Sequence, residues 1–270
     1  MTRPDWASPE IDLTRPCPAR MYDYNLGGSH NFAVDRTYAK RMNEAIPDLS
    51  AIHWTNRSFL RRVVRFLVNS GIRQFLDVGS GIPTVGNVHE IAQKAAPESR
   101  VVYVDIDSVA VVHGNAILTG NDHAAAVRGD VRDAAGILAH PTVRSLIDFT
   151  QPVGVLMLTV LHFVSDQDNP LDVLRTYRDA MSPASYLAIS YATTEGRTGD
   201  QLEEGLRVSS RNRGVVTMRG RAELPPMFEG FDILKPGVVF TPAWRPDSPG
   251  DYFTDQPDRA ATLAAVGVKR

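Results

Sequence analysis

The stretch Ile72-Arg-Gln-Phe-Leu-Asp-Val-Gly-Ser-Gly-Ile-Pro-Thr84 decides the fold of this 270-residue chain. Its apolar run suits a buried strand over about 73–78, and that strand leads directly into a turn with two glycines. A helical pattern follows around 86–96, and a second apolar run over 100–105 ends on Asp105. Strands that alternate with helices at this spacing are typical of a parallel sheet with helices on both faces. We therefore expect an α/β fold.

The rest of the chain extends this pattern. Further strands are expected over 124–128, 152–160 and 185–190, with a late pair over 231–234 and 238–240 and a final apolar run over 264–268. Helices are expected over 56–69, 107–118, 169–181 and 198–212. The first of these helices has apolar side chains three and four residues apart. Four arginines are expected outside its apolar stripe: Arg57, Arg61, Arg62 and Arg65.

The N-terminal part differs from the rest of the chain. Residues 1–19 are rich in proline and lack apolar periodicity, which indicates a flexible arm. Residues 20–56 are dense in aromatic and polar side chains. A helical turn or two that ends at Gly27-Gly28, followed by a helix over about 31–45, predicts a helical lid or cap. Residues 57–270 are expected to form the core.

Composition argues against several classes of function. The formal net charge of -2 gives no general attraction to nucleic acid or to anionic membranes. The arginine-rich stretch 207–221 lacks the interleaved aromatic residues that stack on bases. No apolar run approaches the roughly 18 residues of a membrane helix, and no histidines have the spacing of a metal site. With Cys17 as its single cysteine, we expect a cytoplasmic protein without metal, whose oligomeric state is open.

The turn after the first strand lets a ligand approach the backbone, because Gly79 and Gly81 lack Cβ atoms. A dinucleotide fingerprint, Gly-x-Gly-x-x-Gly, would place a third glycine at position 84, where this chain has Thr84. Pro83 also removes one backbone N–H from the site where a pyrophosphate would bind. The turn is therefore poorly suited to a pyrophosphate. An ordinary strand–helix turn without a ligand is the alternative.

Two carboxylates follow neighbouring strands. Asp105 ends the second strand, where it could accept hydrogen bonds from the vicinal hydroxyls of a ribose. Its alternative role is to cap the following helix, although Asp107 or Ser108 could do this equally well. Asp130 follows the third strand, where it could meet the amine of an adenine, or it could be a solvated turn residue. The glycine turn and Asp105 together predict a pocket for an adenosine-bearing cofactor.

The order of these motifs resembles that of the class I S-adenosylmethionine-dependent methyltransferases. The matching segments are Phe-Leu-Asp-Val-Gly-Ser-Gly (75–81), Val-Val-Tyr-Val-Asp (101–105), Gly-Asp-Val-Arg-Asp (129–133) and Val-Leu-Met-Leu-Thr-Val-Leu-His-Phe (155–163). More narrowly, residues 18–35 together with Asn-Val-His-Glu (87–90) resemble an actinobacterial methyltransferase subfamily catalogued as a domain of unknown function. The resemblance covers about 18–268. It implies a Rossmann-like seven-stranded sheet whose last strand is antiparallel, with S-adenosylmethionine as the cofactor.

The resemblance also implies which residues bind the cofactor, all of them close to strand ends. They are Asp77, Gly79 and Gly81 for the methionine part, Asp105 for the ribose, Ile106, Asp130 and Val131 for the adenine, and Thr159 and His162 near the sulfonium. In one respect the chain departs from the wider superfamily, which often has a third glycine at the position of Pro83. This difference affects the expected shape of the loop after the first strand, but not the expected cofactor.

The expected lid bears on the acceptor. The sulfonium carries its own leaving group, so the enzyme mainly aligns the nucleophile and excludes water. Arg20 and Tyr24 lie four residues apart on one helical face. We expect Arg20 to face the cofactor carboxylate and Tyr24 to line the acceptor pocket, unless both only pack the cap. His162, Tyr24 and His30 are candidate bases; the ordinary pKa of histidine favours His162, although a lone histidine after a strand can be structural.

The sequence thus predicts an S-adenosylmethionine-dependent methyltransferase. The aromatic side chains of the lid, and the lack of a signal for a macromolecular partner, favour a small acceptor. We expect it to be aromatic or heteroaromatic, such as an indole, in secondary metabolism. Two alternatives stay open. An NAD-dependent oxidoreductase would also use Asp105, although the chain has no Tyr-x-x-x-Lys pair. A non-catalytic regulator would bind S-adenosylmethionine without transferring its methyl group.

Overall fold

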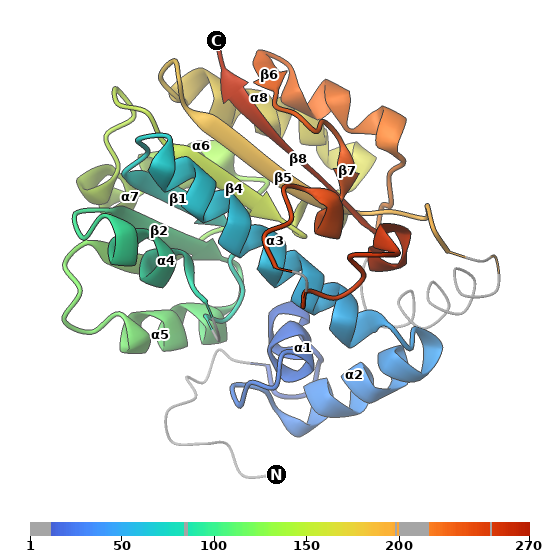
Figure 1. Cartoon of the computed structure of the whole chain (residues 1–270). Coiled ribbons are helices and arrows are strands. Elements are labelled where there is room, and N and C mark those ends of the chain that lie inside the picture. The colour runs from blue at the N-terminus through green and yellow to red at the C-terminus, as the bar shows by residue number, and fades with distance from the viewer. Residues whose placement is uncertain (1–11, 84–85, 198, 200–215, 249) are drawn as a thin grey trace.

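The computed structural model describes residues 12–83, 86–197, 199, 216–248 and 250–270 (Figure 1). Its centre is one sheet with the order β3-β2-β1-β4-β5-β8-β6, and β7 pairs with β8. The strands are β1 (Gln74–Val78), β2 (Arg100–Asp105), β3 (Ala124–Arg128), β4 (Gly154–Leu158), β5 (Tyr186–Ala192), β6 (Phe231–Ile233), β7 (Val239–Phe240) and β8 (Thr262–Lys269). The expected Rossmann-like α/β fold is confirmed.

The sheet is parallel from β3 to β5, and β8 runs antiparallel to β5, as expected for the last strand. The described part of the sheet has eight strands where seven were expected. The extra strand is the two-residue β7, and both members of the expected late pair, β6 and β7, pair with β8. The expected helix over 198–212 lies outside the described residues except for Gly199.

Helices cover both faces of the sheet. The α-helices are α1 (Pro18–Asn25), α2 (Ala33–Ala45), α3 (Leu49–Asn69), α4 (Val88–Ala95), α5 (Ser108–Ile117), α6 (Ala134–Ala139), α7 (Pro141–Leu146) and α8 (Pro170–Ala180). Among the short 3-10 helices, η1 (Leu161–Phe163), η2 (Asp166–Asp168) and η5 (Thr241–Ala243) concern the argument below. None of the helices in the described segments is long and apolar enough to cross a membrane.

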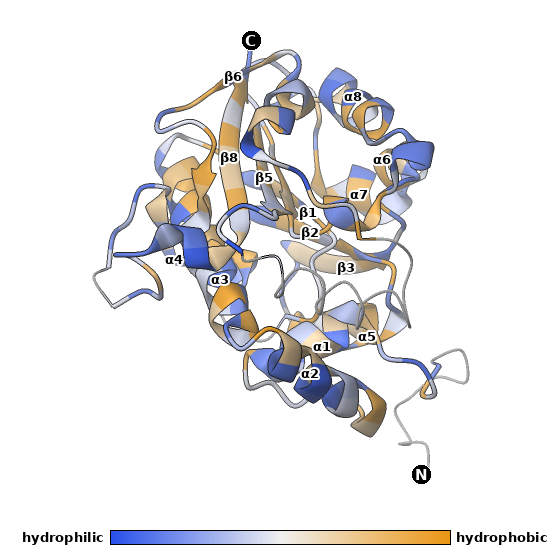
Figure 2. Cartoon of the chain, turned by 90° about the vertical axis from the view of Figure 1, so that its right-hand side faces the viewer, coloured by the Kyte–Doolittle hydropathy of each residue, from blue (hydrophilic) through white to orange (hydrophobic). Residues whose placement is uncertain are grey.

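Each face of the sheet has its own apolar core. On one face, α6, α7 and α8 pack on residues such as Met157, and on the other face α3 and α4 pack on Phe75 and Leu156. All five residues of β1 are buried, which fits a central parallel strand covered on both sides. Figure 2 shows the apolar strands between helices whose outer faces are more hydrophilic. The sheet therefore gives a rigid edge from which loops can present polar groups.

Helix α3 is longer than expected and begins at Leu49, before residue 56. Its first turns bury Ile52 and Thr55 next to the cap, on the same helical face as Phe59. One of its arginines was also placed wrongly by the pattern: Arg62 is 3% exposed. Its Nε donates to Trp244 O (2.9 Å) and its Nη2 to Thr241 O (2.7 Å). Burial is tolerated because the guanidinium is fully engaged, with Asp251 as its counterion.

Helices α1 and α2 form a cap that lies beside α3 and α5 at the end of the molecule opposite to the C-terminus (Figure 1). The turn between them is closed by Asp23, whose Oδ2 accepts hydrogen bonds from His30 N (2.9 Å) and Asn31 Nδ2 (2.8 Å). Asp35 holds the start of the cap, because its carboxylate accepts from Cys17 N and Phe32 N, both at 2.8 Å. Since α3 passes through the expected boundary at 56/57, cap and core share one continuous helix.

Candidate active site

The glycine turn after β1 is shaped by a close approach to the end of β4. Gly79 has φ +74°, and a Cβ there would lie 2.3 Å from Val160 Cγ2, so only glycine fits. Gly81 also has a positive φ, +66°, but no heavy atom lies within 4 Å of the place of its Cβ. The turn therefore packs against the core at Gly79 and leaves open space at Gly81, where a ligand can approach the backbone.

Asp105 joins β2 to this turn. Its Oδ2 accepts a hydrogen bond from Gly81 N (2.7 Å) and its Oδ1 accepts one from Asp107 N (2.8 Å). The alternative role of capping α5 belongs to Asp107, whose carboxylate accepts from Val109 N (2.9 Å). Burial raises the pKa of Asp105 to about 6, against the two backbone hydrogen bonds that lower it. The carboxylate thus lies at the open side of the glycine turn.

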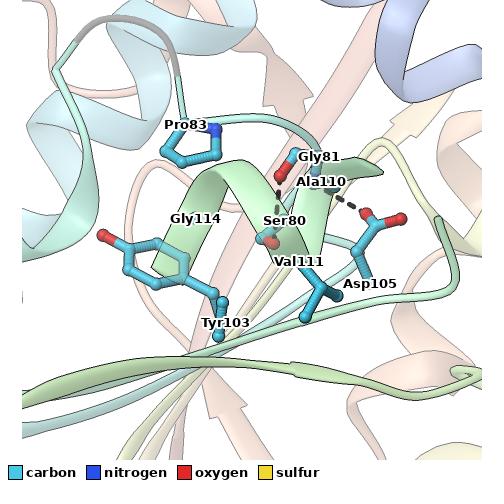
Figure 3. Close-up of a pocket in the computed structure, with 9 residues that line it drawn as sticks. Ser80, Gly81, Pro83, Tyr103, Asp105, Ala110, Val111 and Gly114 are labelled. Atoms are coloured by element: carbon cyan, nitrogen blue, oxygen red, sulfur yellow. Dashed lines mark hydrogen bonds between the residues drawn. The ribbon is translucent and has the colours of Figure 1, made fainter. Parts of the chain in front are cut away.

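Figure 3 shows a small hollow beside this carboxylate, between β2, α5 and the glycine turn. Its walls include Ser80, Pro83, Tyr103 and Gly114, and its interior volume is about 0 Å³ for a sphere of the size of a water molecule. Ligand pockets are typically roughly 300–1,000 Å³. The hollow by itself is therefore too small for a nucleoside cofactor, which would have to lie over the turn and the strand ends.

The residues predicted for the adenine lie on the two loops beside Asp105. Ile106 follows it directly and is 55% exposed, an apolar surface left open at the edge of the sheet. Val131 is half-buried against the core. Asp130 is held by its neighbour Arg132, whose Nε donates to it at 3.0 Å, and this hydrogen bond lowers the pKa of Asp130. Asp105 and the exposed Ile106 thus lie side by side at the edge of the sheet, whereas the carboxylate of Asp130 is already paired with Arg132.

Asp77, the last but one residue of β1, is buried at 3% exposure. Burial raises the pKa of its carboxyl to about 7; the positive charge of Arg57 lowers it and the neighbouring Asp105 raises it further. A cation that reached this carboxyl would favour its ionised form. Asp77 is therefore placed to interact with a positively charged part of a ligand.

A hydrogen-bond network joins the cap to the ends of β4 and β5. Asn56 of α3 is buried; its Nδ2 donates to Tyr22 OH (3.1 Å) and to Thr159 Oγ1 (3.2 Å), and its Oδ1 accepts from Ser190 Oγ (2.7 Å). Tyr22 OH in turn donates to His53 O (3.0 Å). Thr159, a predicted site residue, has φ +53°, which is strained for a β-branched residue. The network holds this strained residue in place.

Sequence reasoning missed Asn56, His53 and Tyr22. A signal for Asn56 was present, since it lies three and four residues before Phe59 and Leu60 on the stripe that faces the core. An amide at a core-facing position needs partners, and here they come from three other elements. His53 and Tyr22 had no comparable signal, because their neighbours are remote in sequence.

His162, the predicted base, lies in η1 after β4 among aromatic rings. Its ring centroid is 4.1 Å from that of Phe163 and 6.2 Å from that of Tyr191. Its Nδ1 is buried and has no hydrogen-bond partner. Burial lowers the pKa of His162 to about 4; burial and the neighbouring His162 lower that of His53 to about 3. Both imidazoles are therefore neutral at pH 7, and His162 has a free nitrogen.

The two predicted cap residues differ in their surroundings. Arg20 is 4% exposed, and its Nε lies 3.4 Å from Asp35 Oδ1 and 3.5 Å from Asp107 Oδ2. These contacts join α1 to the start of α5, and its contact with the cofactor stays a prediction. The Tyr24 hydroxyl has no hydrogen-bond partner among the described residues, so it is available to a ligand. His30, the third candidate base, packs against His113 of α5 with 4.1 Å between ring centroids and the rings tilted by 52°.

The geometry fits an adenosine cofactor with a sulfonium amino-acid end. Asp105 offers a carboxylate to a ribose, Ile106 an apolar side chain to an adenine, and Gly81 a backbone without steric hindrance. Asp77 adds a buried carboxyl on the side of β1, towards which a cationic end can extend. The same turn has no third glycine and has Pro83 next to it, features that do not suit a pyrophosphate.

Comparison with known proteins agrees with this geometry. The model of a family described as S-adenosyl methyltransferase matches residues 4–270. A crystal structure from Thermobifida fusca YX, of a protein proposed to be a methyltransferase, is 40% identical over 99% of this chain and 100% of its own, with a TM-score of 0.91. A DUF574 family protein from Streptomyces avermitilis MA-4680 is 34% identical over 97% of this chain and 100% of its own, also with a TM-score of 0.91.

A more distant structure shares the fold alone. Human N-acetylserotonin methyltransferase in complex with S-adenosylmethionine is 15% identical over 94% of this chain and 63% of its own, with a TM-score of 0.50. No protein with a curated description matches the chain. Between the cofactors left open by the sequence, the family match favours the methyl donor over the redox dinucleotide.

Proposed function

Because this chain belongs to the S-adenosyl methyltransferase family, it is an S-adenosylmethionine-dependent methyltransferase, and we propose that its acceptor is a small aromatic or heteroaromatic molecule. The observation that carries this proposal is the gathering of rings at the carboxyl ends of β4 and β5, below the cap. His162 lies there between Phe163 and Tyr191. On the cap side, the rings of Tyr22 and His53 stack at 4.3 Å between centroids.

Ring-lined surroundings favour a flat acceptor, since aromatic rings pair by stacking and by edge-to-face contact. A small aromatic substrate also fits a cap that is tied to the sheet by Asn56, because such a cap leaves little room for a macromolecule. We extend the proposal to a role in secondary metabolism, where methylation of such rings is a typical modification. Tyr24, with its unpartnered hydroxyl, is proposed to line the acceptor pocket.

In the proposed reaction the acceptor loses a proton and gains a methyl group. When bound, S-adenosylmethionine supplies that methyl group on a sulfonium, and its sulfur keeps the electron pair of the broken bond. His162 accepts the acceptor's proton on Nδ1, which is buried and has no hydrogen-bond partner. Its low pKa, about 4, keeps it neutral and ready to accept the proton, but also makes it a weak base. Such a base suits a ring carbon or nitrogen that is acidified by methylation itself.

The other site residues are proposed to bind and orient the cofactor. Asp105 is proposed to hold the ribose, Ile106 and Val131 to contact the adenine, and Asp77 with Gly79 and Gly81 to line the methionine part. Asp130 and Thr159 are proposed to complete the adenine pocket and the sulfonium side, respectively. The strained backbone of Thr159 supports its assignment, because strain of this kind clusters at functional sites.

The test is a panel of acceptors with S-adenosylmethionine, with products identified by mass spectrometry. The panel contains indoles, phenols, pyridines and, for contrast, aliphatic amines and alcohols. We expect methylated product from at least one aromatic class and none from the aliphatic classes. Product from aliphatic acceptors alone would contradict the proposal. Cofactor binding without product from any acceptor would instead favour the non-catalytic regulator.

The role of His162 is tested on the same acceptor by His162→Asn. Loss of a general base typically lowers the rate by about 10²–10⁴-fold, so kcat should fall while cofactor affinity stays the same. His123→Asn is the matched control, because His123 is exposed at the start of β3, away from the cap. An unchanged kcat in His162→Asn would remove His162 from proton transfer, although the aromatic acceptor could still be correct.

A further inference from the structure

Helix α3 carries four arginines, and three of them have a carboxylate partner. Arg61 lies 3.1 Å from Asp251 Oδ2, Arg62 lies 2.7 Å from the same atom, and Arg65 pairs with Asp247. These ion pairs join α3 to the segment after η5. Arg57, one turn earlier, has no carboxylate within ion-pair distance among the described residues. Arg57 is therefore the one arginine of α3 whose guanidinium forms no ion pair within the described residues.

Arg57 lies beside the start of α4, the helix that follows the glycine turn. Among the described residues its side chain makes one hydrogen bond, a long one from Nη2 to Asn87 Oδ1 (3.3 Å), and Asn87 precedes the first residue of α4. Its Nε is buried and has no hydrogen-bond partner. A buried N–H of a charged group without a partner is costly, and native proteins rarely leave one. Most of the five N–H donors of this guanidinium thus have no hydrogen-bond partner among the described residues.

The charges around Arg57 define what it can bind. Burial raises the pKa of Asp77 of β1, of Tyr103 of β2 and of Tyr22 of the cap, and the positive charge of Arg57 opposes this rise at all three groups. Arg57 therefore lies within electrostatic range of the cap and of the first two strands. Asp77 and Asp105 make this space negative, so an anionic ligand group needs a cation here, and Arg57 is placed to be that cation.

We propose that Arg57 binds the carboxylate of the methionine portion of S-adenosylmethionine, an assignment that rests on the proposed function. Guanidinium and carboxylate form two parallel hydrogen bonds in a geometry that lysine cannot reproduce. The carboxyl of Asp77, which lies within the electrostatic influence of Arg57, is left for the ammonium group of the same amino acid. The positive Arg57 and the acidic Asp77 thus match the two charges of a zwitterion in one orientation.

The surroundings of Arg20 favour Arg57 for this role. Arg20 lies between Asp35 and Asp107, and its Nη atoms donate to backbone oxygens of Asp12 and Arg15. Binding a third carboxylate would require Arg20 to leave partners that hold the cap to α5. Arg57 would give up only its long hydrogen bond to Asn87.

The experiment measures binding of two ligands by titration calorimetry. S-Adenosylhomocysteine carries the amino-acid carboxylate, and 5′-methylthioadenosine has the same nucleoside and sulfur but lacks it. In Arg57→Gln we expect about ten- to hundredfold weaker binding of S-adenosylhomocysteine, the usual effect of losing hydrogen bonds to a charged group. Binding of 5′-methylthioadenosine should change by less than about twofold, which also shows that the variant is folded.

Two further variants sharpen the comparison. Arg65→Gln removes the same charge from the same helix, but its guanidinium is half-exposed and pairs with Asp247, so both affinities should stay at the wild-type level. Arg57→Lys keeps the charge without the planar fork and should bind S-adenosylhomocysteine with intermediate affinity. Arg20→Gln should weaken both ligands together if Arg20 only holds the cap.

Several results would overturn the assignment. An unchanged affinity of Arg57→Gln for S-adenosylhomocysteine would exclude a contact with the carboxylate. An equal loss for both ligands would show that Arg57 supports the turn through Asn87. Unchanged cofactor binding with a raised KM for an acidic acceptor would assign Arg57 to the acceptor. A wild-type protein that binds neither ligand would overturn the proposed function and this assignment with it, an outcome distinct from the others.

Discussion

Asn56→Ala removes the amide that joins the cap to the sheet. Asn56 makes hydrogen bonds to Tyr22, Thr159 and Ser190, and it is 4% exposed. A typical hydrogen bond contributes about 0.5–1.5 kcal/mol net, so losing all of them should cost about 2–4 kcal/mol of unfolding free energy. For a chain of this size that corresponds to a fall in Tm on the order of 10 °C.

The assay is urea unfolding followed by far-UV circular dichroism, with thermal unfolding as a second measurement. Tyr22→Phe is the partner variant, because its hydroxyl both accepts from Asn56 and donates to His53 O. The two substitutions share one hydrogen bond, so the double variant should lose about 0.5–1.5 kcal/mol less than the sum of the single losses. Thr37→Ala, on the exposed face of α2, is the control and should change stability by less than about 0.5 kcal/mol.

Two results would refute this reasoning. A loss below about 1 kcal/mol for Asn56→Ala would mean that water replaces the lost hydrogen bonds at little cost. Strict additivity of Asn56→Ala and Tyr22→Phe would mean that the two residues do not interact in solution.

Other predictions concern the turn and its carboxylates. Gly79→Ala should cost several kcal/mol in urea unfolding because its Cβ would meet Val160 at 2.3 Å, whereas Gly81→Ala, with open space, should cost only the roughly 1–2 kcal/mol of its positive φ; equal losses would contradict this. Burial raises the folded-state pKa of Asp77 from the ordinary 3.8 to about 7, so its stabilising contribution is complete below about pH 4 and is lost as the pH rises through about 7. Asp77→Asn should therefore make stability fall less between about pH 5 and pH 8, and an unchanged slope would show that Asp77 has an ordinary pKa. Asp105→Asn should weaken S-adenosylhomocysteine binding about ten- to hundredfold, and an unchanged affinity in calorimetry would remove Asp105 from the site.

The sheet could be predicted closely from the sequence because its signal is local. The apolar runs at 73–78 and 100–105 coincide with β1 and β2 to within a residue. A strand buried on both faces must be almost wholly apolar, so its composition reveals it without knowledge of its partners. The pairing of the short β7 with β8 could not be predicted in this way, since it depends on the path of the chain between them.

The helices show where local signals fail. The apolar stripe of α3 revealed the helix from residue 56, but in its first turns polar residues such as Thr55 and Asn56 occupy the buried face, so that the stripe is not apolar there. Arg62 was expected outside because arginine is rarely buried. Its burial depends on carbonyl groups of Thr241 and Trp244, which are far away in sequence and became available only through the fold.

In the candidate site too, local sequence signals indicate some residues and not others. Gly79, Gly81 and Asp105 were found because a motif of adjacent residues carries their geometry. Arg57 and Asn56 lie on a neighbouring helix, and nothing next to them in the sequence indicates a ligand. Arg20 was expected at the cofactor from its helical spacing to Tyr24, and this stays a prediction; the contacts of Arg20 with Asp35 and Asp107 could not be foreseen from that spacing.

The place of β8 has a consequence for how this sheet is made during translation. β8 pairs with β5 on one side and with β6 and β7 on the other, and it follows all of them in the chain. Until the ribosome has produced residues 262–269, the nascent protein carries β5 with a bare edge, and bare edges recruit strands from other chains. The sheet is therefore completed only when β8 is available, and before that the open edge of β5 is exposed to pairing with other chains.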